Sequence, residues 1–268
     1  MNTIELQEKA RQIRIDIIKM IAKAGSGHPG GSLSATDILV ALYYSKLNLR
    51  GGFEDPDRDR VIFSKGHAAP AHYAVLADKG AFPKEDLDTL RQFGSHLQGH
   101  PDSAKCRGID CSTGSLGQGT SVGVGMALAL KTKKSPAKVY VFTGDGELQE
   151  GIMWEAFMSA AHFKVDNLTV IIDRNRLQID GNVADVMNVE DLKMKMEGFG
   201  FAVDVIDGHN FDEILPALDK FYEGKPHAII ANTIKGKGVS FMENKAGWHG
   251  TAPKPEEAEA AIKELEGK

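Results

Sequence analysis

The segment Val139-Tyr-Val-Phe-Thr-Gly-Asp-Gly-Glu-Leu-Gln-Glu150 predicts a buried strand followed directly by a turn suited to binding a ligand. The β-branched and aromatic residues of its first half are typical of such a strand. Gly144 and Gly146 let the backbone turn sharply and approach a ligand closely. Asp145 lies between them at the carboxyl end of the strand, where open α/β sheets place their ligands.

A second polar position follows the next expected strand. After an amphipathic helix, the apolar strand 168–172 runs into a loop that contains Asn175. Mg²⁺ and Ca²⁺ take oxygen ligands and commonly keep few protein ligands beside phosphate oxygens. Asp145 offers a carboxylate oxygen, Asn175 an amide oxygen, and Leu177 a backbone carbonyl. The sequence therefore predicts a divalent metal (Mg²⁺, Ca²⁺ or Mn²⁺) that anchors a diphosphate, whose charge the glycine amides and the following helix N-terminus favour.

Two other interpretations of this segment remain open on spacing alone. Gly-Asp-Gly is a common turn sequence, so the glycines and Asn175 could be turn residues only. A nucleotide-binding βαβ unit is the main competing class. Against it, no G-x-G-x-x-G follows a first strand, and no Walker A lysine is present.

Composition excludes several functions. The chain has 268 residues, 42% of them hydrophobic, which suffices for one α/β domain over residues 1–268. A net charge of −5 provides no basic field for nucleic acid. No apolar run approaches the ~18 residues of a membrane span, and no secretory signal is evident. Cys106 and Cys111 provide neither a disulfide framework nor a zinc site, so we interpret them as structural or incidental and expect a reduced cytoplasm.

The remaining elements follow from hydrophobic periodicity and turn signals. We expect Ser34 to cap a helix after a loop at residues 28–31, with Asp37 in its first turn. The expected helices are 3–23, one from about 68, a charged one at 84–93, one through 131, 189–199, 212–222 and an exposed terminal one at 255–268; the expected further strands are 60–63, 201–205 and 227–231.

Three histidines and a lysine stand beside glycines at element ends. His28, His67 and His100 could be solvated or capping residues, but their shared context favours hydrogen bonding and proton transfer to a ligand. Lys235 lies between a strand and two glycines, where an ammonium can meet a phosphate; a solvated loop lysine is the alternative. We interpret His209 as structural.

Seven segments together resemble transketolases. They are SGHPGGSLS at 26–34, SKGHAAP at 64–70, GHP at 99–101, TGSLGQG at 113–119, GDGELQEG at 144–151, TIKGKG at 233–238 and WHG at 248–250. Several motifs in the same order over most of the chain make chance an unsatisfactory explanation. The resemblance implies an open, mostly parallel sheet flanked by helices, of the type that binds the diphosphate of thiamine diphosphate.

The resemblance also implies roles for individual residues. The implied catalytic residues are His28, His67, His100 and His249. The implied cofactor-binding residues are His67, Gly114, Ser115, Leu116, Gly144, Asp145, Gly146, Glu150, Asn175, Lys235 and His249, with Glu150 steadying the loops. The implied metal ligands are Asp145, Asn175 and Leu177.

One part of a transketolase site is missing from the sequence. In the family, a glutamate from a second, pyrimidine-binding domain pairs with the cofactor ring, and that domain normally follows in the same chain. Here the sequence stops at Lys268. We therefore expect a natural N-terminal subunit of a split transketolase, inactive alone. A C-terminal subunit with the pyrimidine-binding and C-terminal domains would complete it in an α2β2 assembly.

The expected reaction moves a two-carbon ketol unit from a ketose phosphate to an aldose phosphate, as in the pentose phosphate pathway. Three alternatives stay open. The chain could be a subunit of another split thiamine diphosphate enzyme, such as a 2-oxo acid dehydrogenase, although the SGHPGG, SKGH and WHG segments argue against this. It could act on an unusual sugar phosphate. It could also be a non-catalytic homologue that binds the cofactor.

Overall fold

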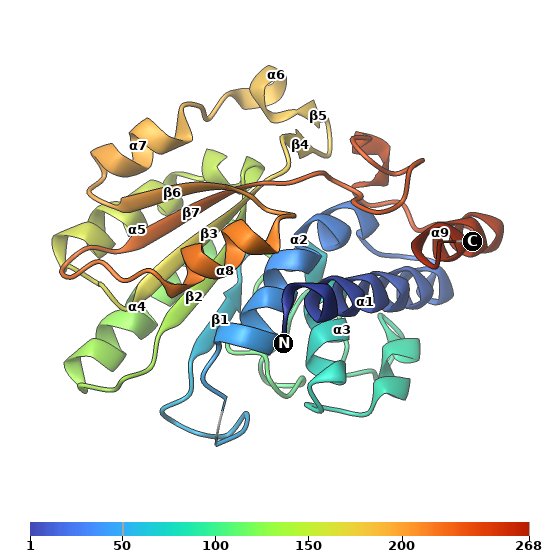
Figure 1. The fold of residues 1–268 in the computed structure, drawn as a ribbon, viewed down its shortest axis with the longest axis horizontal. Coiled ribbons are helices and arrows are strands. Elements are labelled where there is room, and N and C mark those ends of the chain that lie inside the picture. Colours follow the sequence, from blue (N-terminus) through green and yellow to red (C-terminus); the bar gives the residue numbers. More distant parts are fainter. Residues whose placement is uncertain (50, 268) are drawn as a thin grey trace.

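A five-stranded sheet in the order β1-β2-β3-β7-β6 forms the centre of the protein in a computed structural model, which describes residues 1–49 and 51–267 (Figure 1). All four neighbouring pairs are parallel, which confirms the expected α/β fold. The strands are β1 (Arg60–Phe63), β2 (Val139–Gly144), β3 (Leu168–Arg174), β6 (Ala202–Asp207) and β7 (His227–Asn232). A separate antiparallel pair consists of β4 (Leu177–Gln178) and β5 (Gly181–Asn182).

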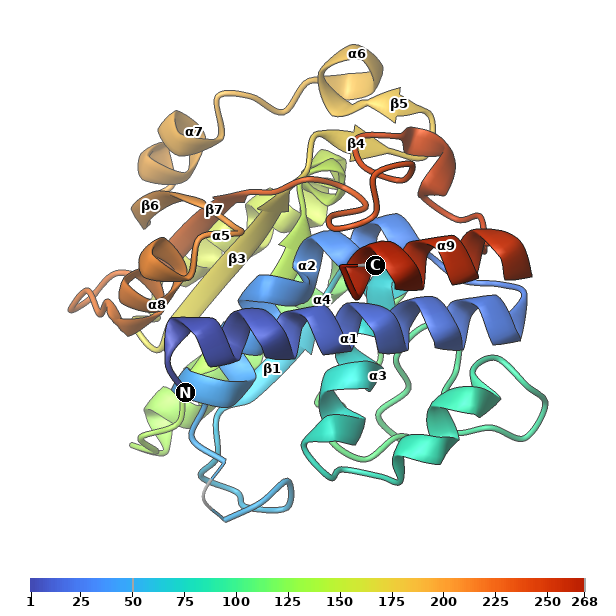
Figure 2. The ribbon, with the colours of Figure 1, turned by 45° about the vertical axis from the view of Figure 1, so that its right-hand side comes forward.

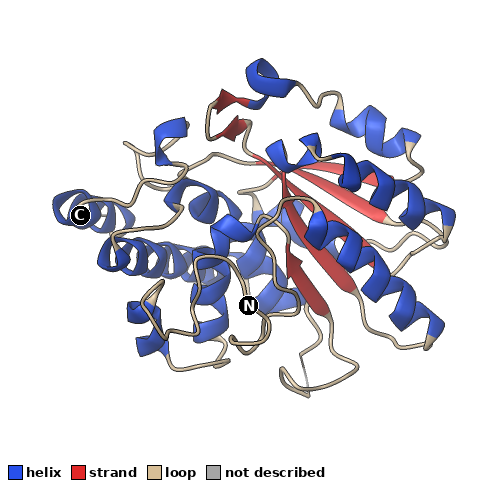
Figure 3. Ribbon diagram, turned by 180° about the vertical axis from the view of Figure 1, so that it is seen from behind, coloured by secondary structure: helices blue, strands red, loops and turns tan. Residues whose placement is uncertain are grey.

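Helices cover both faces of the sheet because successive strand residues point to opposite faces. Tyr140 and Phe142 pack on the side of α1 (Thr3–Ala24), α2 (Pro29–Ala41), α3 (Ala69–Asp78), α8 (Phe211–Asp219) and α9 (Pro255–Leu265). Val139 and Val141 pack on the side of α4 (Gln118–Thr132), α5 (Gly151–His162) and α7 (Leu192–Gly198). Figure 3, seen from behind, shows helices lying across the strands on this second face. The short helix α6 (Val183–Met187) follows β5.

The first and last helices lie side by side although the whole chain separates them (Figure 2). Asn2 caps α1 by accepting from the Glu5 amide at 2.9 Å. In α9 the face carrying Ala258, Ala261 and Leu265 is buried. The terminal helix is therefore only half exposed, because its apolar face packs on α1. Among the described residues, no helix combines the length and apolar character needed to cross a membrane.

Register decides where the polar residues after the strands meet. Phe63 pairs with Phe142, Gly144 with Asp173, and Arg174 with Asn232. The ends of β1, β2, β3 and β7 are thereby aligned along one edge of the sheet. The polar segments that follow each of these strands consequently open onto the same region.

Two sequence-based expectations about helices are wrong. The second helix begins at Pro29, within the expected loop, because proline is preorganised for the first helical position. Ser34 is therefore not an N-cap but lies wholly buried inside α2, and Asp37 is buried there too instead of in a first turn. The charged segment 84–93 is a 3₁₀-helix over Lys84–Thr89 and not an amphipathic α-helix, since the chain turns extended at Leu90 and left-handed at Arg91.

The other expected elements are present with shifted ends. Asp191 caps α7 by accepting from the amides of Lys193 and Met194, so this helix begins at Leu192 and not at residue 189. Asn210 caps α8, which ends at Asp219 before the expected residue 222. The side chains of Asp191 and Asn210 thus set the starts of these two helices, which periodicity alone misplaced.

We predict opposite effects for two alanine substitutions on α4. A Cβ at Gly123 would lie 2.4 Å from Cγ2 of Val141 on the central sheet, whereas a Cβ at Gly125 would meet nothing within 4 Å. Gly123→Ala should lower the free energy of unfolding by about 1–3 kcal/mol through overpacking. Gly125→Ala should raise it by about 0.5–1 kcal/mol through helix propensity. Urea unfolding of both variants checks this, and equal effects would contradict the packing of α4 on β2.

Candidate functional site

A cavity of about 170 Å³ opens at the carboxyl edge of the sheet. Ten of the sequence-predicted site residues line it: His67, Leu116, Gly144, Asp145, Gly146, Glu150, Asn175, Leu177, Lys235 and His249. His28, His100, Gly114 and Ser115 do not line it. Residues from both halves of the chain thus line one cavity, because the strands that precede them end side by side.

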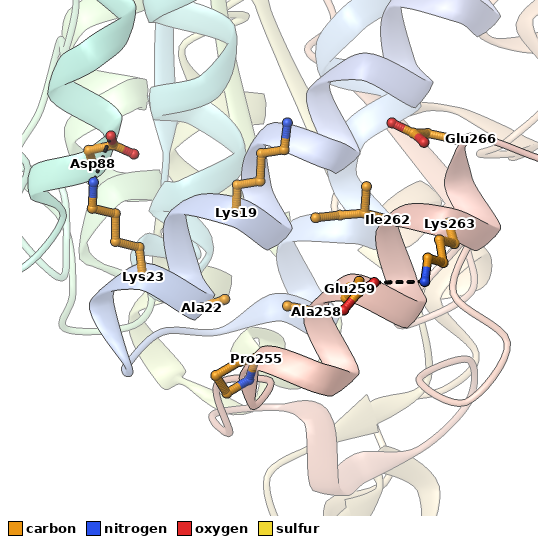
Figure 4. A pocket seen from close by; sticks show the side chains of 10 residues that line it. All are labelled: Lys19, Ala22, Lys23, Asp88, Pro255, Ala258, Glu259, Ile262, Lys263 and Glu266. Atoms are coloured by element: carbon orange, nitrogen blue, oxygen red, sulfur yellow. Dashed lines mark hydrogen bonds and ion pairs between the residues drawn. The ribbon is translucent and has the colours of Figure 1, made fainter. Parts of the chain in front are cut away.

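A wider groove of about 580 Å³ lies elsewhere, between α1 and α9 (Figure 4). Its rim carries the exposed ion pairs Lys23–Asp88 and Lys263–Glu259. None of the sequence-predicted site residues lines this groove. We therefore place the candidate site in the smaller cavity, where buried charged groups converge.

Asp145 is a buried carboxylate, and no lysine, arginine or histidine side chain of residues 1–49 and 51–267 forms an ion pair with it. Its Oδ1 accepts from the Gly146 amide at 2.8 Å and its Oδ2 from the Arg176 amide at 2.5 Å. Burial, followed by the nearby Asp173 carboxylate, raises the pKa of Asp145 to about 6. A divalent cation would relieve both effects, so Asp145 fits a metal ligand.

Asn175 and Leu177 add two neutral oxygens on the same turn. Oδ1 of Asn175 accepts from the Leu177 amide at 3.1 Å, and the Leu177 carbonyl accepts from Nζ of Lys235 at 3.0 Å. A carbonyl oxygen has two lone pairs, so these contacts leave capacity for a cation. Within residues 1–49 and 51–267, no three His, Cys, Asp or Glu side chains form a metal-binding group. The fitting set is one of carboxylate, amide and carbonyl oxygens, which suits Mg²⁺ or Ca²⁺.

Four histidines form one cluster, and two of them, His67 and His249, line the cavity. The ring of His28 lies 5.3 Å from that of His67, 6.2 Å from that of His100 and 5.5 Å from that of His249. His67 and His249 stack at 4.9 Å. Gly114 stands against His100: a Cβ there would lie 3.3 Å from its ring. The structure thus brings together all four histidines implied by the resemblance.

The pKa of each histidine in the cluster lies below the ordinary imidazole value. Burial, then the charge of Arg91, lowers the pKa of His28 to about 4, and burial, then Lys235, lowers that of His249 to about 3. Burial, followed by the nearby charge of Lys65, also lowers the pKa of His67. Neutral imidazoles can both donate and accept hydrogen bonds, which suits contacts with sugar hydroxyls.

We expect His28 and His249 to stay largely neutral at pH 5. At this pH a group with a pKa of 4 is about 10% protonated, whereas an ordinary imidazole with a pKa of 6.5 is about 97% protonated. NMR titration of the imidazole nitrogens checks this, with the urea-unfolded chain as the control. The unfolded state binds protons near pH 6.5 that these folded histidines do not bind. Stability should therefore be complete above about pH 6.5 and fall as the pH drops towards 4. Midpoints near 6.5 in the folded chain would contradict the partial burial of His28 and His249.

Lys235 joins the histidine cluster to the metal-binding turn. It is only 1% exposed, and burial, then the charge of Lys65, lowers its pKa to about 8. Its Nζ lies 2.8 Å from Nδ1 of His249 and bonds the Leu177 carbonyl. A buried ammonium at this point can meet an anionic phosphoryl group.

Sequence reasoning missed two buried residues in this cavity, Lys65 and Glu147. Lys65 forms an ion pair with Asp173, which is wholly buried. Although burial opposes ionisation, Lys65 and hydroxyl donors hold the pKa of Asp173 below its usual value. The sequence did carry a signal for Lys65. This lysine, in SKGH, directly follows an apolar strand with no polar loop between them, which favours a buried position.

Glu147 makes contacts that hold the loops around the cavity, a role that we expected for Glu150. Its Oε1 accepts from Oγ of Ser64 at 2.5 Å and from the Gly117 amide at 2.8 Å, and its Oε2 accepts from Oγ1 of Thr143 at 2.6 Å. Glu150 is exposed at the rim of the cavity. The 3₁₀ turn at Gly146–Gln149 directs Glu147 inward, and the role expected for Glu150 stays a prediction.

Comparison with known proteins places this site in a family. The family model "Transketolase, thiamine diphosphate binding domain" matches residues 6–267. A 6-deoxy-6-sulfo-D-fructose transketolase subunit of Clostridium sp. (strain MSTE9) is 46% identical, over 98% of this chain and 97% of its own length. An apulose-4-phosphate transketolase subunit of Actinobacillus succinogenes is 42% identical, over 97% of this chain and 96% of its own length.

Solved structures agree. The crystal structure of transketolase from Campylobacter jejuni superposes with a TM-score of 0.92 and 37% identity, covering 99% of this chain and 43% of that one. The chain thus spans about two-fifths of the length of that transketolase. These matches define the class as a thiamine diphosphate-binding α/β domain. The chain belongs to the transketolase family and corresponds to its N-terminal, thiamine diphosphate-binding part.

Proposed function

We propose that this chain is the N-terminal subunit of a transketolase that transfers a two-carbon ketol unit from a ketose phosphate to an aldose phosphate. The observation that carries the proposal is one cavity in which three oxygen ligands, a buried lysine and neutral histidines converge. Thiamine diphosphate would supply a carbanion and electron sink when bound. The remaining work, which is to bind, orient and move protons, falls to this chain and its partner.

Each group has a distinct task in this proposal. Asp145, Asn175 and the Leu177 carbonyl hold the divalent metal, and Lys235 meets the anionic diphosphate at the same turn. Leu116 and Gly146 line the cavity wall and leave space for the cofactor. The neutral histidines His28, His67, His100 and His249 bond sugar hydroxyls and carry protons to and from them.

A partner subunit completes the site in this proposal. Relatives of the same length carry the word subunit in their names, whereas transketolase from Homo sapiens, 39% identical, is covered over only 42% of its length. We propose that a separate C-terminal subunit supplies the pyrimidine-binding and C-terminal domains, in an α2β2 assembly in the cytoplasm. The relatives support a partner of this kind.

A second candidate concerns the sugar. The two relatives with 46% and 42% identity are named for 6-deoxy-6-sulfofructose and apulose 4-phosphate. These names favour a transketolase for a modified ketose over one confined to the pentose phosphate pathway. A 2-oxo acid dehydrogenase subunit finds no support in the family match.

The test is ketol transfer measured with the chain alone, the partner alone and the mixture. The donors would be ordinary ketose phosphates, 6-deoxy-6-sulfofructose and apulose 4-phosphate, each with an aldose phosphate acceptor. We expect turnover only in the mixture, with Mg²⁺ and thiamine diphosphate present. Full turnover by this chain alone would refute the split site, and cofactor binding without transfer from any donor would indicate a non-catalytic homologue.

A further inference from the structure

Asp173 accepts from four side chains at the floor of the candidate site. Its Oδ2 accepts from Oγ of Ser34 at 2.7 Å, from Nδ2 of Asn175 at 3.3 Å and from Nζ of Lys65, while its Oδ1 accepts from Oγ1 of Thr233. All five residues are at most 6% exposed. A wholly buried carboxylate is costly unless it is paired and hydrogen-bonded, so these contacts define a specific arrangement.

The four donors belong to four of the segments that carry the site. Ser34 lies on α2, which follows His28, and Lys65 precedes His67 after β1. Thr233 precedes Lys235 after β7, and Asn175 follows β3. Lys65 also donates to the Gly31 carbonyl at 3.1 Å, next to the histidine-bearing end of α2. Asp173 therefore joins the segments that bear His28, His67, Lys235 and Asn175.

The contact with Asn175 fixes the direction of its amide. A carboxylate can only accept, so the amide must point its nitrogen towards Asp173. Its oxygen then points the other way, towards the turn, where it accepts from the Leu177 amide. The two contacts together hold the oxygen towards the metal-binding turn, and without the carboxylate only the Leu177 amide would hold it there.

We infer that Asp173, with Lys65 as its counter-ion, is a positioning residue for the metal site: it presents the amide oxygen of Asn175 to the divalent cation. The inference rests on the proposed metal–diphosphate function of the cavity. Asp173 itself has its oxygens occupied by Lys65, Ser34 and Thr233, so it acts through Asn175 and not as a ligand. Partners that orient metal ligands typically change metal affinity by about 10–100-fold.

The test measures Mn²⁺ affinity by calorimetry with saturating thiamine diphosphate, on the full chain and on its complex with the partner subunit. We expect Asp173→Asn to raise the Mn²⁺ dissociation constant at least about tenfold. Asp110→Asn is the matched control: Asp110 pairs with Arg58 at 2.6 Å and accepts from the Val61 amide, near the start of β1 and outside the cavity. It should lower the melting temperature without changing Mn²⁺ affinity.

A second variant covers the case in which Asp173→Asn does not fold. Lys65→Met combined with Asp173→Leu removes both charges, and buried ion pairs tolerate such apolar replacement. Since no charge is left unpaired, weaker Mn²⁺ binding would report the lost acceptor for Asn175. Wild-type affinity in either folded variant would overturn the inference while leaving the proposed function intact. Failure of the wild-type chain and complex to bind Mn²⁺ would instead overturn the proposed function.

Discussion

Asp145→Asn is expected to weaken Mn²⁺ binding, measured with thiamine diphosphate present, by more than about 100-fold. The substitution removes the only charged oxygen among the three proposed ligands, and partners that merely orient ligands already account for about 10–100-fold. Ketol transfer by the assembled enzyme should fall in parallel at limiting metal. Calorimetry and a metal titration of activity measure the two effects.

The same variant should not be less stable without metal. Burial raises the pKa of Asp145 to about 6. Its contribution to stability is therefore complete below about pH 4 and is lost as the pH rises through 6, and the ionised group opposes folding at pH 7.5 by roughly 3 kcal/mol. Asp145→Asn should keep or raise the melting temperature of the free chain but lose the increase caused by Mn²⁺ with thiamine diphosphate.

Asp166→Asn serves as the control for charge. Asp166 pairs with Lys131 at 2.7 Å and accepts from the Gly224 amide, at the opposite edge of the sheet from the cavity. Its replacement should leave Mn²⁺ binding unchanged. If Asp145→Asn also bound Mn²⁺ as the wild type does, Asp145 would not be a metal ligand.

Asp37→Leu is expected to reduce the free energy of unfolding by about 3–5 kcal/mol, because it leaves a buried cation without its partner. Nη1 and Nη2 of Arg14 bond Asp37 at 3.0 and 2.6 Å, and Arg14 is only 7% exposed. Nδ1 of His209 lies 2.6 Å from the same carboxylate, and its Nε2 accepts from the Ile234 amide. This network joins α1 and α2 to the segment that leads into Lys235.

Urea unfolding at pH 7 measures the effect, with Asp88→Asn as the matched control. Asp88 pairs with Lys23 at the surface, where both side chains are more than half exposed. Such a pair contributes little, so the control should lie within about 0.5 kcal/mol of wild type. If both variants lost the same free energy of unfolding, the hydrogen bonds around Asp37 would contribute no more to stability than a surface ion pair.

The site at the sheet edge was largely predictable from sequence because its signals are local. The apolar strand that stops at Gly144-Asp145-Gly146 predicted a carboxylate at the carboxyl end of a strand in an α/β sheet. The same reasoning applies to Asn175 after β3. Parallel pairing then aligns the strand ends, so residues distant in the chain were expected to meet. His209 likewise bonds within the framework, as a structural histidine does.

What remained hidden depends on tertiary contacts. Serine is a residue type typical of helix caps, yet Ser34 lies inside α2, which begins at Pro29, and donates a hydrogen bond to the buried carboxylate of Asp173. Lys65 and Asp173 are 108 positions apart, and no periodicity connects them. The choice between Glu147 and Glu150 depends on a single 3₁₀ turn that sequence patterns do not specify. Buried polar pairs therefore escaped prediction, whereas strand ends did not.

The most direct test is a calorimetric titration of thiamine diphosphate into the chain with Mg²⁺ and, separately, with a chelator of divalent ions. If the turn bearing Asp145 and Asn175 anchors the diphosphate through a cation, binding should saturate at one cofactor per chain with Mg²⁺. It should be at least about 100-fold weaker with the chelator. Equal affinity under both conditions would contradict a metal-anchored diphosphate.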